Sequence, residues 1–287
     1  MVRKIKGIIL DVDGVIIGER PGFNFPSPHD DVISKLREVN LKGIPIALCT
    51  AKPQFSISSV IKKIGLDNYH IADGGGVIVN PIQNKVVKKN LIKNKLAAKV
   101  IEFFLDHNTY VEFYTVDDYF IQKDQISNIT NKHVPILLKK PKVVKSLVSK
   151  SLKSEITKIV LVAKDEKDKD RLIKLLKPFA EKLNFYWGLH PSALPLQFGV
   201  LTAPGVSKKQ GAREIAKNIK VSFKNILGVG DTVGDWQFIK LCGYGAAMGN
   251  AKLELKKLVL AKGKGRGLVG PSVDKNGIIK ILDYFVK

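Results

Sequence analysis

Two aspartates, Asp11 and Asp13, directly follow the apolar run Ile8–Leu10 and are separated by a single valine. The apolar run predicts a buried strand, and in an open parallel sheet ligands bind outside the carboxyl ends of the strands. Two carboxylates at such an end can hold a hard cation such as Mg²⁺, or divide the roles of nucleophile and general acid/base between them. A calcium-binding EF-hand loop does not fit, because Gly22 stands where that loop needs glutamate.

Further polar residues stand at or near the ends of other predicted elements. Thr50 ends a second apolar run, and Lys208 begins a predicted helix late in the chain. Asp231 follows the apolar run after that helix, and Asp235 lies four residues further on. If the strands are parallel neighbours, these side chains converge on one edge of the sheet together with the aspartate pair.

This combination of residue types suits phosphoryl transfer. A carboxylate can attack phosphorus to form an aspartyl-phosphate, and a second carboxylic acid can protonate the leaving alcohol and later deprotonate the attacking water. A Mg²⁺ ion offsets the repulsion between nucleophile and phosphate, while a hydroxyl and an ammonium can hold the phosphoryl oxygens. Each residue also has an ordinary explanation as a turn, cap or surface residue. Their order along the chain favours the catalytic interpretation.

The spacing of apolar residues predicts alternating strands and helices at both ends of the chain. In the first part the strands are Lys4–Leu10, Ile44–Cys49 and His70–Ala72, and the helices are Asp30–Asn40 and Ser56–Ile64. In the last part helices from Ser207 to Ile219 and from Ala251 to Ala261 accompany the strands Ile226–Val229 and Tyr244–Met248. This alternation predicts an α/β fold with a doubly wound parallel sheet.

The middle of the chain has a different pattern. Apolar runs paired around short turns, such as Tyr110–Tyr114 and Tyr119–Gln122, predict antiparallel strands. Three consecutive glycines, Gly74–Gly76, mark a turn or hinge before this part. We therefore expect residues 1–80 and 198–287 to form one domain, with residues 81–197 inserted as an α+β domain.

The composition places the chain among globular proteins. Its 287 residues are 45% apolar, and no apolar run is long enough to cross a bilayer. The basic and then apolar N-terminus lacks a signal-peptide cleavage site. Cys49 and Cys242 lie in apolar surroundings that predict buried thiols, and their spacing fits neither a zinc site nor a redox motif. These features favour a cytoplasmic location without a membrane partner.

The net charge of +22 arises from 48 basic and 26 acidic residues. The lysines are spread along the chain without the aromatic interleaving typical of RNA-binding proteins, which favours a solvated basic surface over a nucleic-acid interface. Such a surface would attract anionic substrates. The basic, glycine-rich run Lys262–Gly267 does not match a phosphate-binding P-loop. An exposed turn is the favoured interpretation, with anion contact through backbone N–H groups as the alternative.

Four stretches in the same order carry a resemblance to the haloacid dehalogenase (HAD) superfamily of aspartate-nucleophile phosphatases. They are Asp11–Val15, Leu48–Thr50, Val206–Gly211 and Gly230–Asp235. Met248–Ala251 also resembles a stretch downstream of the fourth motif in the Cof-like, or type IIB, branch. The resemblance covers about residues 1–76 and 200–287.

The resemblance implies a role for each matching residue. Asp11 would be the nucleophile, and Asp13 the general acid/base. Both would ligate Mg²⁺ together with Asp231, Asp13 through its backbone carbonyl. Thr50 and Lys208 would hold the phosphoryl group.

The remaining matching residues would support this set. Asp235 would orient Lys208 or a metal-bound water, and Asn250 would support the site. Three departures from the family pattern stand out: Gly234 replaces a frequent asparagine, Ala51-Lys52 replaces a frequent Gly-Arg, and Val15 replaces a common threonine. None of them removes a carboxylate, so we still expect activity.

The resemblance also implies a Rossmann-like core with a large α/β cap, which would close over the site and read the leaving group. Gly74–Gly76 and Ala203–Gly205 would be its hinge strands. Trp187 and His190 lie late in the expected cap, where contact with substrate and simple packing are alternative roles.

The implied function is that of a Mg²⁺-dependent phosphatase, a phosphoric monoester hydrolase acting through an aspartyl-phosphate intermediate. The expected partner is a small phosphorylated metabolite, with sugar phosphates favoured. A sugar phosphomutase of the same superfamily is the alternative, because the acid pair does not distinguish water from a sugar hydroxyl as acceptor. A basic nucleic-acid-binding protein on this scaffold is the less favoured third interpretation, and the oligomeric state is left open.

Overall fold

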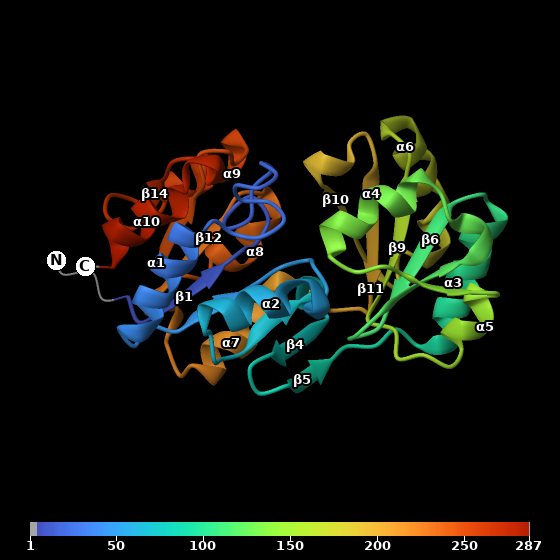
Figure 1. Cartoon of the computed structure of the whole chain (residues 1–287), viewed down its shortest axis with the longest axis horizontal. Helices are drawn as coiled ribbons and strands as arrows, with labels where there is room; N and C mark the ends of the chain where they lie inside the picture. Colours follow the sequence, from blue (N-terminus) through green and yellow to red (C-terminus); the bar gives the residue numbers. More distant parts are fainter. Residues whose placement is uncertain (1–4, 287) are drawn as a thin grey trace. The chain divides into compact units, whose positions relative to one another are not determined.

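The structure is a computed structural model that describes residues 5–286, and the chain folds into two compact units (Figure 1). The first unit comprises the chain up to Ala51, Ile57–Val87 and the chain from Ser207 onward. The second unit comprises Lys52–Ser56 and Lys88–Val206. Lys4, the first residue of a predicted strand, lies outside the described residues.

The first unit is built on a five-stranded sheet in which every neighbouring pair is parallel. In sheet order the strands are β14 (Gly267–Val269), β13 (Tyr244–Ala247), β12 (Ile226–Gly230), β1 (Gly7–Leu10) and β2 (Ile46–Leu48). The residues of β1, β2 and β12 are all buried, as expected for parallel strands covered on both faces. The predicted α/β fold with a parallel sheet is therefore confirmed.

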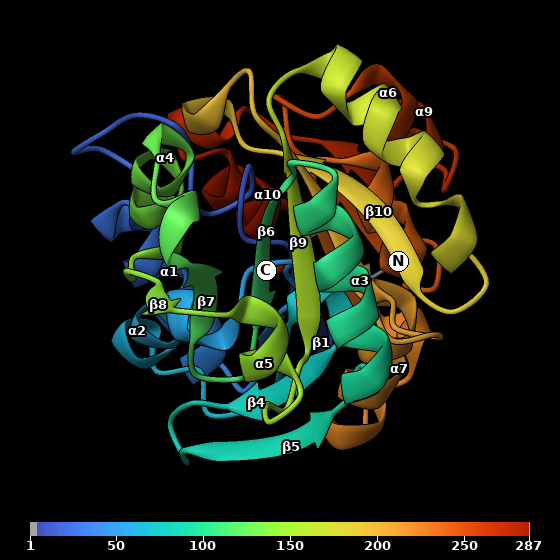
Figure 2. The same cartoon turned by 90° about the vertical axis from the view of Figure 1, so that its right-hand side faces the viewer.

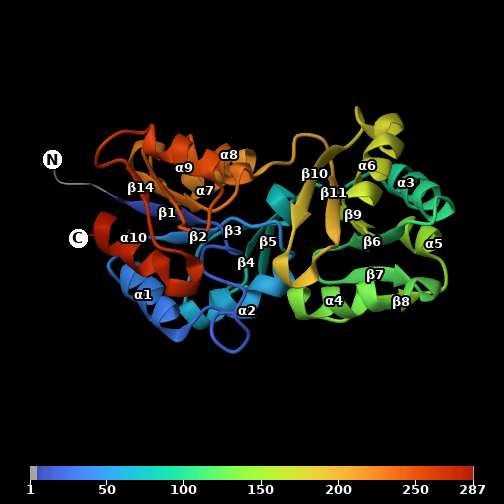
Figure 3. The ribbon, with the colours of Figure 1, turned by 90° about the horizontal axis from the view of Figure 1, so that it is seen from above.

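Helices cover both faces of this sheet (Figure 3). The helices on one face are α7 (Lys208–Asn218), α8 (Trp236–Ile239) and α9 (Leu253–Leu260). The other face carries α1 (Asp30–Leu41), α2 (Gln54–Ile64) and α10 (Gly277–Phe285). Ile9 and Ile226 of the sheet share one hydrophobic cluster with Ile215, Phe238 and Val259 of the first three helices. Removing such side chains from water is the main force that holds the layers together.

A small second sheet adjoins the parallel one within the first unit. It consists of β3 (His70–Ala72), β4 (Val77–Asn80) and β5 (Lys85–Lys89), with β3 antiparallel to β4. An isolated parallel bridge joins Ile71 to Cys49, so β3 runs in the same direction as β2. Residues that follow β1, β2, β3 and β12 consequently meet at one edge.

The second unit is built on a six-stranded sheet of the expected antiparallel kind, with one parallel pair at its edge. In sheet order the strands are β10 (Asn184–Leu189), β11 (Gln197–Thr202), β9 (Lys158–Ala163), β6 (Tyr110–Tyr114), β7 (Tyr119–Gln122) and β8 (Lys142–Val144). One face packs on α3 (Asn94–Asp106), α5 (Leu147–Ser151) and α6 (Glu166–Leu175), and the other on α4 (Asn128–Leu137) (Figure 2).

The expected domain limits differ from the two observed units. A limit between residues 197 and 198 would cut through β11, all of which is hydrogen-bonded into the sheet of the second unit. At the other junction the first unit extends to Val87, because β5 lies beside β4 in the small sheet of that unit.

The glycine run also has a different place from the one expected for a hinge. Gly74 and Gly75 are buried inside the first unit. Gly75 has φ +112°, and a Cβ atom there would lie 2.4 Å from the backbone oxygen of Ser207. Position 75 requires glycine because two backbone segments approach each other closely there.

No helix within residues 5–286 combines the length and the apolar character needed to span a membrane.

Candidate active site

The nucleophile candidate Asp11 lies directly after β1, where its backbone N–H donates to the carbonyl oxygen of Val229 on β12 (3.0 Å). Its side chain is buried. The turn that follows needs glycine at position 14, because φ is +75° and a Cβ atom would lie 2.1 Å from a carboxylate oxygen of Asp231. The turn after β1 and the loop after β12 are therefore packed directly against each other.

Lys208 points its ammonium group at two carboxylates. Its Nζ lies 2.9 Å from Oδ1 of Asp11 and 2.7 Å from Oδ1 of Asp235. The lysine begins α7, whose N-cap Ser207 accepts a hydrogen bond from the backbone N–H of Gln210. The cap and the contact of α7 with the glycine turn hold the lysine in place.

Asp235 is fully buried, and its second carboxylate oxygen is saturated with donors. Oδ2 accepts from the backbone N–H groups of Asp231 (3.1 Å) and Thr232 (2.9 Å), and from Oγ1 of Thr232 (3.0 Å). Gly230 is required beside it, because a Cβ atom there would lie 2.4 Å from Cβ of Asp235. Asp235 thus holds the loop after β12 together and presents Oδ1 to Lys208.

Carboxylate oxygens of Asp11, Asp231 and Asp235 lie within 4.8 Å of one another. Within the described chain, Oδ1 of Asp231 is buried and has no hydrogen-bond partner. Converging hard oxygens with an unsatisfied acceptor among them are what Mg²⁺ requires of a protein site. The donor set therefore fits a divalent cation.

The electrostatics of the cluster favour the binding of a cation. Burial and then the neighbouring Asp235 raise the pKa of Asp11 to about 7. Burial and then Asp11 and Asp235 raise the pKa of Asp231 to about 8. Burial opposes the charge of Lys208, but Asp11 and Asp235 hold its pKa well above the usual value. The ammonium of Lys208 therefore does not hold the pKa values of Asp11 and Asp231 in their usual range.

The predicted metal set and the observed carboxylate cluster overlap in Asp11 and Asp231. The cluster has Asp235 as its third member. The prediction for Asp13 concerns its backbone carbonyl, which a side-chain cluster does not test. Asp13 lies half-buried in the turn after β1, where it forms an isolated bridge with Ile17.

Thr50 lies at the same edge, one strand away from Asp11. It is buried, its backbone N–H donates to the oxygen of Ile71 (3.0 Å), and its own carbonyl accepts from Gly74 N–H (2.9 Å). Cys49 before it donates its N–H to the oxygen of Leu10 (2.7 Å). These bonds place the threonine beside the end of β1, as the sequence predicts.

Asn250 bridges segments that are distant in sequence. Its Nδ2 donates to the carbonyl oxygen of Gly14 (2.9 Å), and its Oδ1 accepts from the backbone N–H of Val273 (2.9 Å). The side chain thereby fixes the turn after β1, and its supporting role in catalysis stays a prediction.

Sequence reasoning missed Thr232, which contributes two of the three donors to Oδ2 of Asp235. A threonine followed three residues later by an acidic residue is the pattern of a capping box, and the structure has this box over Thr232–Asp235. That signal was present in the sequence.

The two candidates of the second unit lie on and after β10. Trp187 packs against Phe185, with ring centroids 5.6 Å apart, and against the main hydrophobic cluster of that unit. Its Nε1 is buried without a partner among the described residues. His190 follows the strand and is also buried. Packing accounts for most of the Trp187 ring, and substrate contact by either residue stays a prediction.

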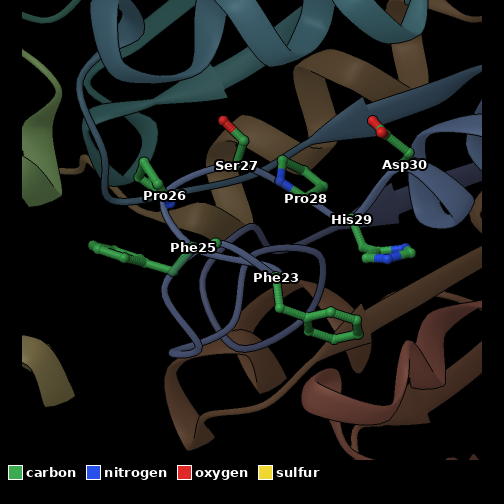
Figure 4. A pocket seen from close by; sticks show the side chains of 8 residues that line it. Phe23, Phe25, Pro26, Ser27, Pro28, His29 and Asp30 are labelled. Carbon is green, nitrogen blue, oxygen red and sulfur yellow. The ribbon is translucent and has the colours of Figure 1, made fainter.

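A separate open hollow of about 340 Å³ lies on the first unit (Figure 4). Its lining comes from the segment 22–30, in which the rings of Phe23 and Phe25 point away from each other. The Phe23 ring packs near that of His29, with centroids 4.5 Å apart. None of the predicted site residues lines this hollow, so it is distinct from the carboxylate cluster.

Comparisons with known proteins agree with this fold. The chain is 22% identical over 272 residues to phosphatase YwpJ of Bacillus subtilis (strain 168), covering 88% of this chain and 93% of that protein. A haloacid dehalogenase-like hydrolase from Bacteroides thetaiotaomicron has the same fold, with TM-score 0.83, 18% identity and coverage of 98% and 99% of the two chains. A sugar phosphatase of HAD subclass IIB also matches in fold, with TM-score 0.76, 19% identity and 98% coverage of each chain.

The family model for haloacid dehalogenase-like hydrolases matches residues 8–282, which includes all four motifs and the segment between them. The predicted resemblance is thereby confirmed over nearly the whole chain, and the chain belongs to the family of haloacid dehalogenase-like hydrolases.

Proposed function

We propose that the protein is a Mg²⁺-dependent phosphatase that hydrolyses a small phosphomonoester, with a sugar phosphate as the favoured class. The observation that carries this proposal is the contact of Lys208 Nζ with Asp11 (2.9 Å) and Asp235 (2.7 Å) beside the unsatisfied carboxylate of Asp231. A nucleophilic carboxylate, a fixed cation and a metal-ligand set at one sheet edge are the parts that phosphoryl transfer needs.

In the first step a carboxylate oxygen of Asp11 attacks phosphorus, and the bond from phosphorus to the ester oxygen breaks. Asp13 gives its proton to that oxygen, so the leaving group departs as a neutral alcohol. The product is an aspartyl-phosphate on Asp11.

In the second step a water attacks the phosphorus of the aspartyl-phosphate while Asp13 accepts its proton. The phosphorus–Asp11 bond breaks, inorganic phosphate leaves, and Asp11 returns to its carboxylate form. Lys208 and the Thr50 hydroxyl hold the phosphoryl oxygens through both steps, and Asp235 keeps Lys208 directed at them.

Asp11, Asp231 and the backbone carbonyl of Asp13 would hold Mg²⁺, whose positive charge would offset the repulsion between carboxylates and substrate phosphate. The raised pKa values of Asp11 and Asp231 and the unsatisfied Oδ1 of Asp231 support this assignment. A sugar phosphate is favoured because a subclass IIB sugar phosphatase shares the fold over 98% of both chains.

The test is phosphate release from p-nitrophenyl phosphate and from a panel of sugar phosphates, with and without Mg²⁺. Asp11→Asn should abolish turnover, whereas the matched variant Asp106→Asn, at an exposed position at the end of α3, should leave it unchanged. Free phosphate must appear in step with substrate loss, because an isomerised sugar phosphate without free phosphate would identify a mutase. Turnover that survives Asp11→Asn, or that ignores chelation of Mg²⁺, would reject the proposal.

A further inference from the structure

The amino-terminal ends of the parallel strands, at the edge of the sheet opposite the candidate active site, are lined with cations. Asp11 and Asp231 follow the carboxyl ends of β1 and β12, so the segments that precede β1, β12, β13 and β14 lie at the other edge. We call the basic residues of these segments the basic edge. They are Lys6, Lys220, Lys224, Lys240, Lys262, Lys264 and Arg266.

The segments of the basic edge are in direct contact with one another. The backbone N–H of Gly243 donates to the oxygen of Phe223 (2.7 Å), and that of Lys6 donates to the oxygen of Asn225 (2.9 Å). Lys262 Nζ donates to the oxygen of Cys242 (2.6 Å). Because neighbouring strands lie about 4.8 Å apart, the four segments form one continuous surface roughly 15 Å across.

Among residues 5–286, these cations lack acidic partners. The segments 219–225, 240–243 and 261–266 contain no aspartate or glutamate. Within the part of the chain that the structure describes, none of the seven side chains pairs with a carboxylate. Partial burial and then the nearby Arg266 lower the pKa of Lys262 below its usual value. The basic edge is therefore a surface of uncompensated like charge.

Helix geometry explains only part of this charge. The helices α7, α8 and α9 end at this edge, and a cation near a helix C-terminus is favourable because of the helix dipole. Lys220, Lys240 and Lys262 follow these helix ends directly and need no other explanation. Lys264 and Arg266 lie in a turn and Lys6 precedes β1, where no helix end attracts them, and Lys224 lies in the single 3₁₀ turn Phe223–Asn225.

We propose that the basic edge binds the phosphate backbone of a nucleic acid without reading its sequence. A duplex carries one phosphate charge per about 1.7 Å of axis, so a span of roughly 15 Å offers enough phosphates for these cations. Gly263 and Gly265 have φ of +91° and +78°, and a Cβ atom at either position would meet nothing within 4 Å. The loop backbone there is open for close approach by phosphates.

A lipid surface fits this edge less well, because stable membrane binding needs an apolar or lipid anchor besides a basic patch. Among the described residues, the segments of the basic edge contain no exposed large apolar side chain, although Leu260 at the end of α9 is exposed beside the loop. The surface also lies on the far edge of the sheet from Lys208 and Asp235. Nucleic-acid binding there is consequently independent of the proposed phosphatase chemistry.

The test compares two triple variants that remove the same charge. The first is Lys224→Gln/Lys264→Gln/Arg266→Gln, and the matched control is Lys167→Gln/Lys174→Gln/Lys177→Gln on exposed positions of the second unit. Fluorescence anisotropy with a labelled random duplex of about 20 base pairs gives the dissociation constant from about 50 to 200 mM salt. The first variant should reduce the slope of log affinity against log salt by about 2.7, because each lost phosphate contact removes about 0.9.

The control variant should bind as the wild-type protein does, and both variants should keep the wild-type melting temperature and phosphatase turnover. Equal losses in the two variants would show that only the net charge matters and would reject a defined surface. Absence of duplex binding by the wild-type protein at the lowest salt would also reject it. Binding to vesicles of anionic lipid that depends on the basic edge, without duplex binding, would assign the surface to membranes instead.

Discussion

The hydroxyl of Thr232 is expected to position Lys208, the proposed phosphate-binding lysine, through Asp235. Its Oγ1 donates to Oδ2 of Asp235 at 3.0 Å, and Oδ1 of the same carboxylate accepts from Lys208 at 2.7 Å. Thr232→Val keeps the shape of the side chain and removes this donor, while the two backbone donors remain. The carboxylate can then rotate, and the direction of Lys208 towards Asp11 becomes less defined.

The size of the effect follows from the hydrogen bond that is lost. A hydrogen bond to a charged group contributes about 1.5–3 kcal/mol. Thr232 itself is exposed, so water can replace part of the missing donor, and we expect the lower end of that range. Because about 1.4 kcal/mol corresponds to a tenfold change in rate, kcat should fall about tenfold. KM should change little if Thr232 acts only through its contacts with Asp235.

The assay is steady-state hydrolysis of p-nitrophenyl phosphate at saturating Mg²⁺, with Thr232→Ser as the conservative variant. Serine restores the hydroxyl and should return kcat to within about twofold of the wild-type value. Melting temperatures of both variants separate a loss of position from a loss of folding. Full activity of Thr232→Val, or equal damage by Thr232→Ser, would refute this reasoning.

Two further predictions concern stability. His70 is fully buried and burial lowers its pKa from 6.5 to about 4, so between these values the unfolded chain binds a proton that the folded chain does not. The contribution of His70 to the free energy of unfolding should therefore be fully present above pH 6.5 and should fall by roughly 3 kcal/mol as the pH drops to about 4. Denaturant titrations at several pH values should show a weaker dependence of the unfolding free energy on pH for His70→Gln than for the wild-type protein. The same dependence in both proteins would contradict this. Gly75→Ala should lower the unfolding free energy by roughly 2 kcal/mol or more through positive φ and the approach of Ser207, whereas Gly43→Ala, with φ +78° in open space, should lose about 1 kcal/mol. Equal losses in the two glycine variants would show that the contact with Ser207 is unimportant.

The position of the candidate active site was predictable from the sequence because several of its residues end recognisable apolar runs. Asp11, Thr50 and Asp231 each follow a buried strand, and parallel strands bring their carboxyl ends to one edge. Lys208 was predictable as the first residue of a capped helix. Local pattern therefore sufficed to place these residues in the same region of the fold.

The contacts between these residues were not predictable in the same way. Lys208 and Asp11 are 197 positions apart, and Asn250 and Gly14 are 236 positions apart. Apolar periodicity reports which face of an element is buried, but not which element lies beside it. Strand order and register decide that, and they have no local signal in the chain.

The domain limits and the distribution of charge show the same division. The sequence by itself determined that a parallel core carries an inserted antiparallel unit and that lysines are dispersed along the chain. Only the tertiary structure showed that β11 belongs wholly to the second unit, and that Lys224, Lys264 and Arg266 share one edge with no acid between them. The physical reason is that residue type and local spacing determine which side chains are buried. Contacts between distant segments form only when strands from distant parts of the chain pair.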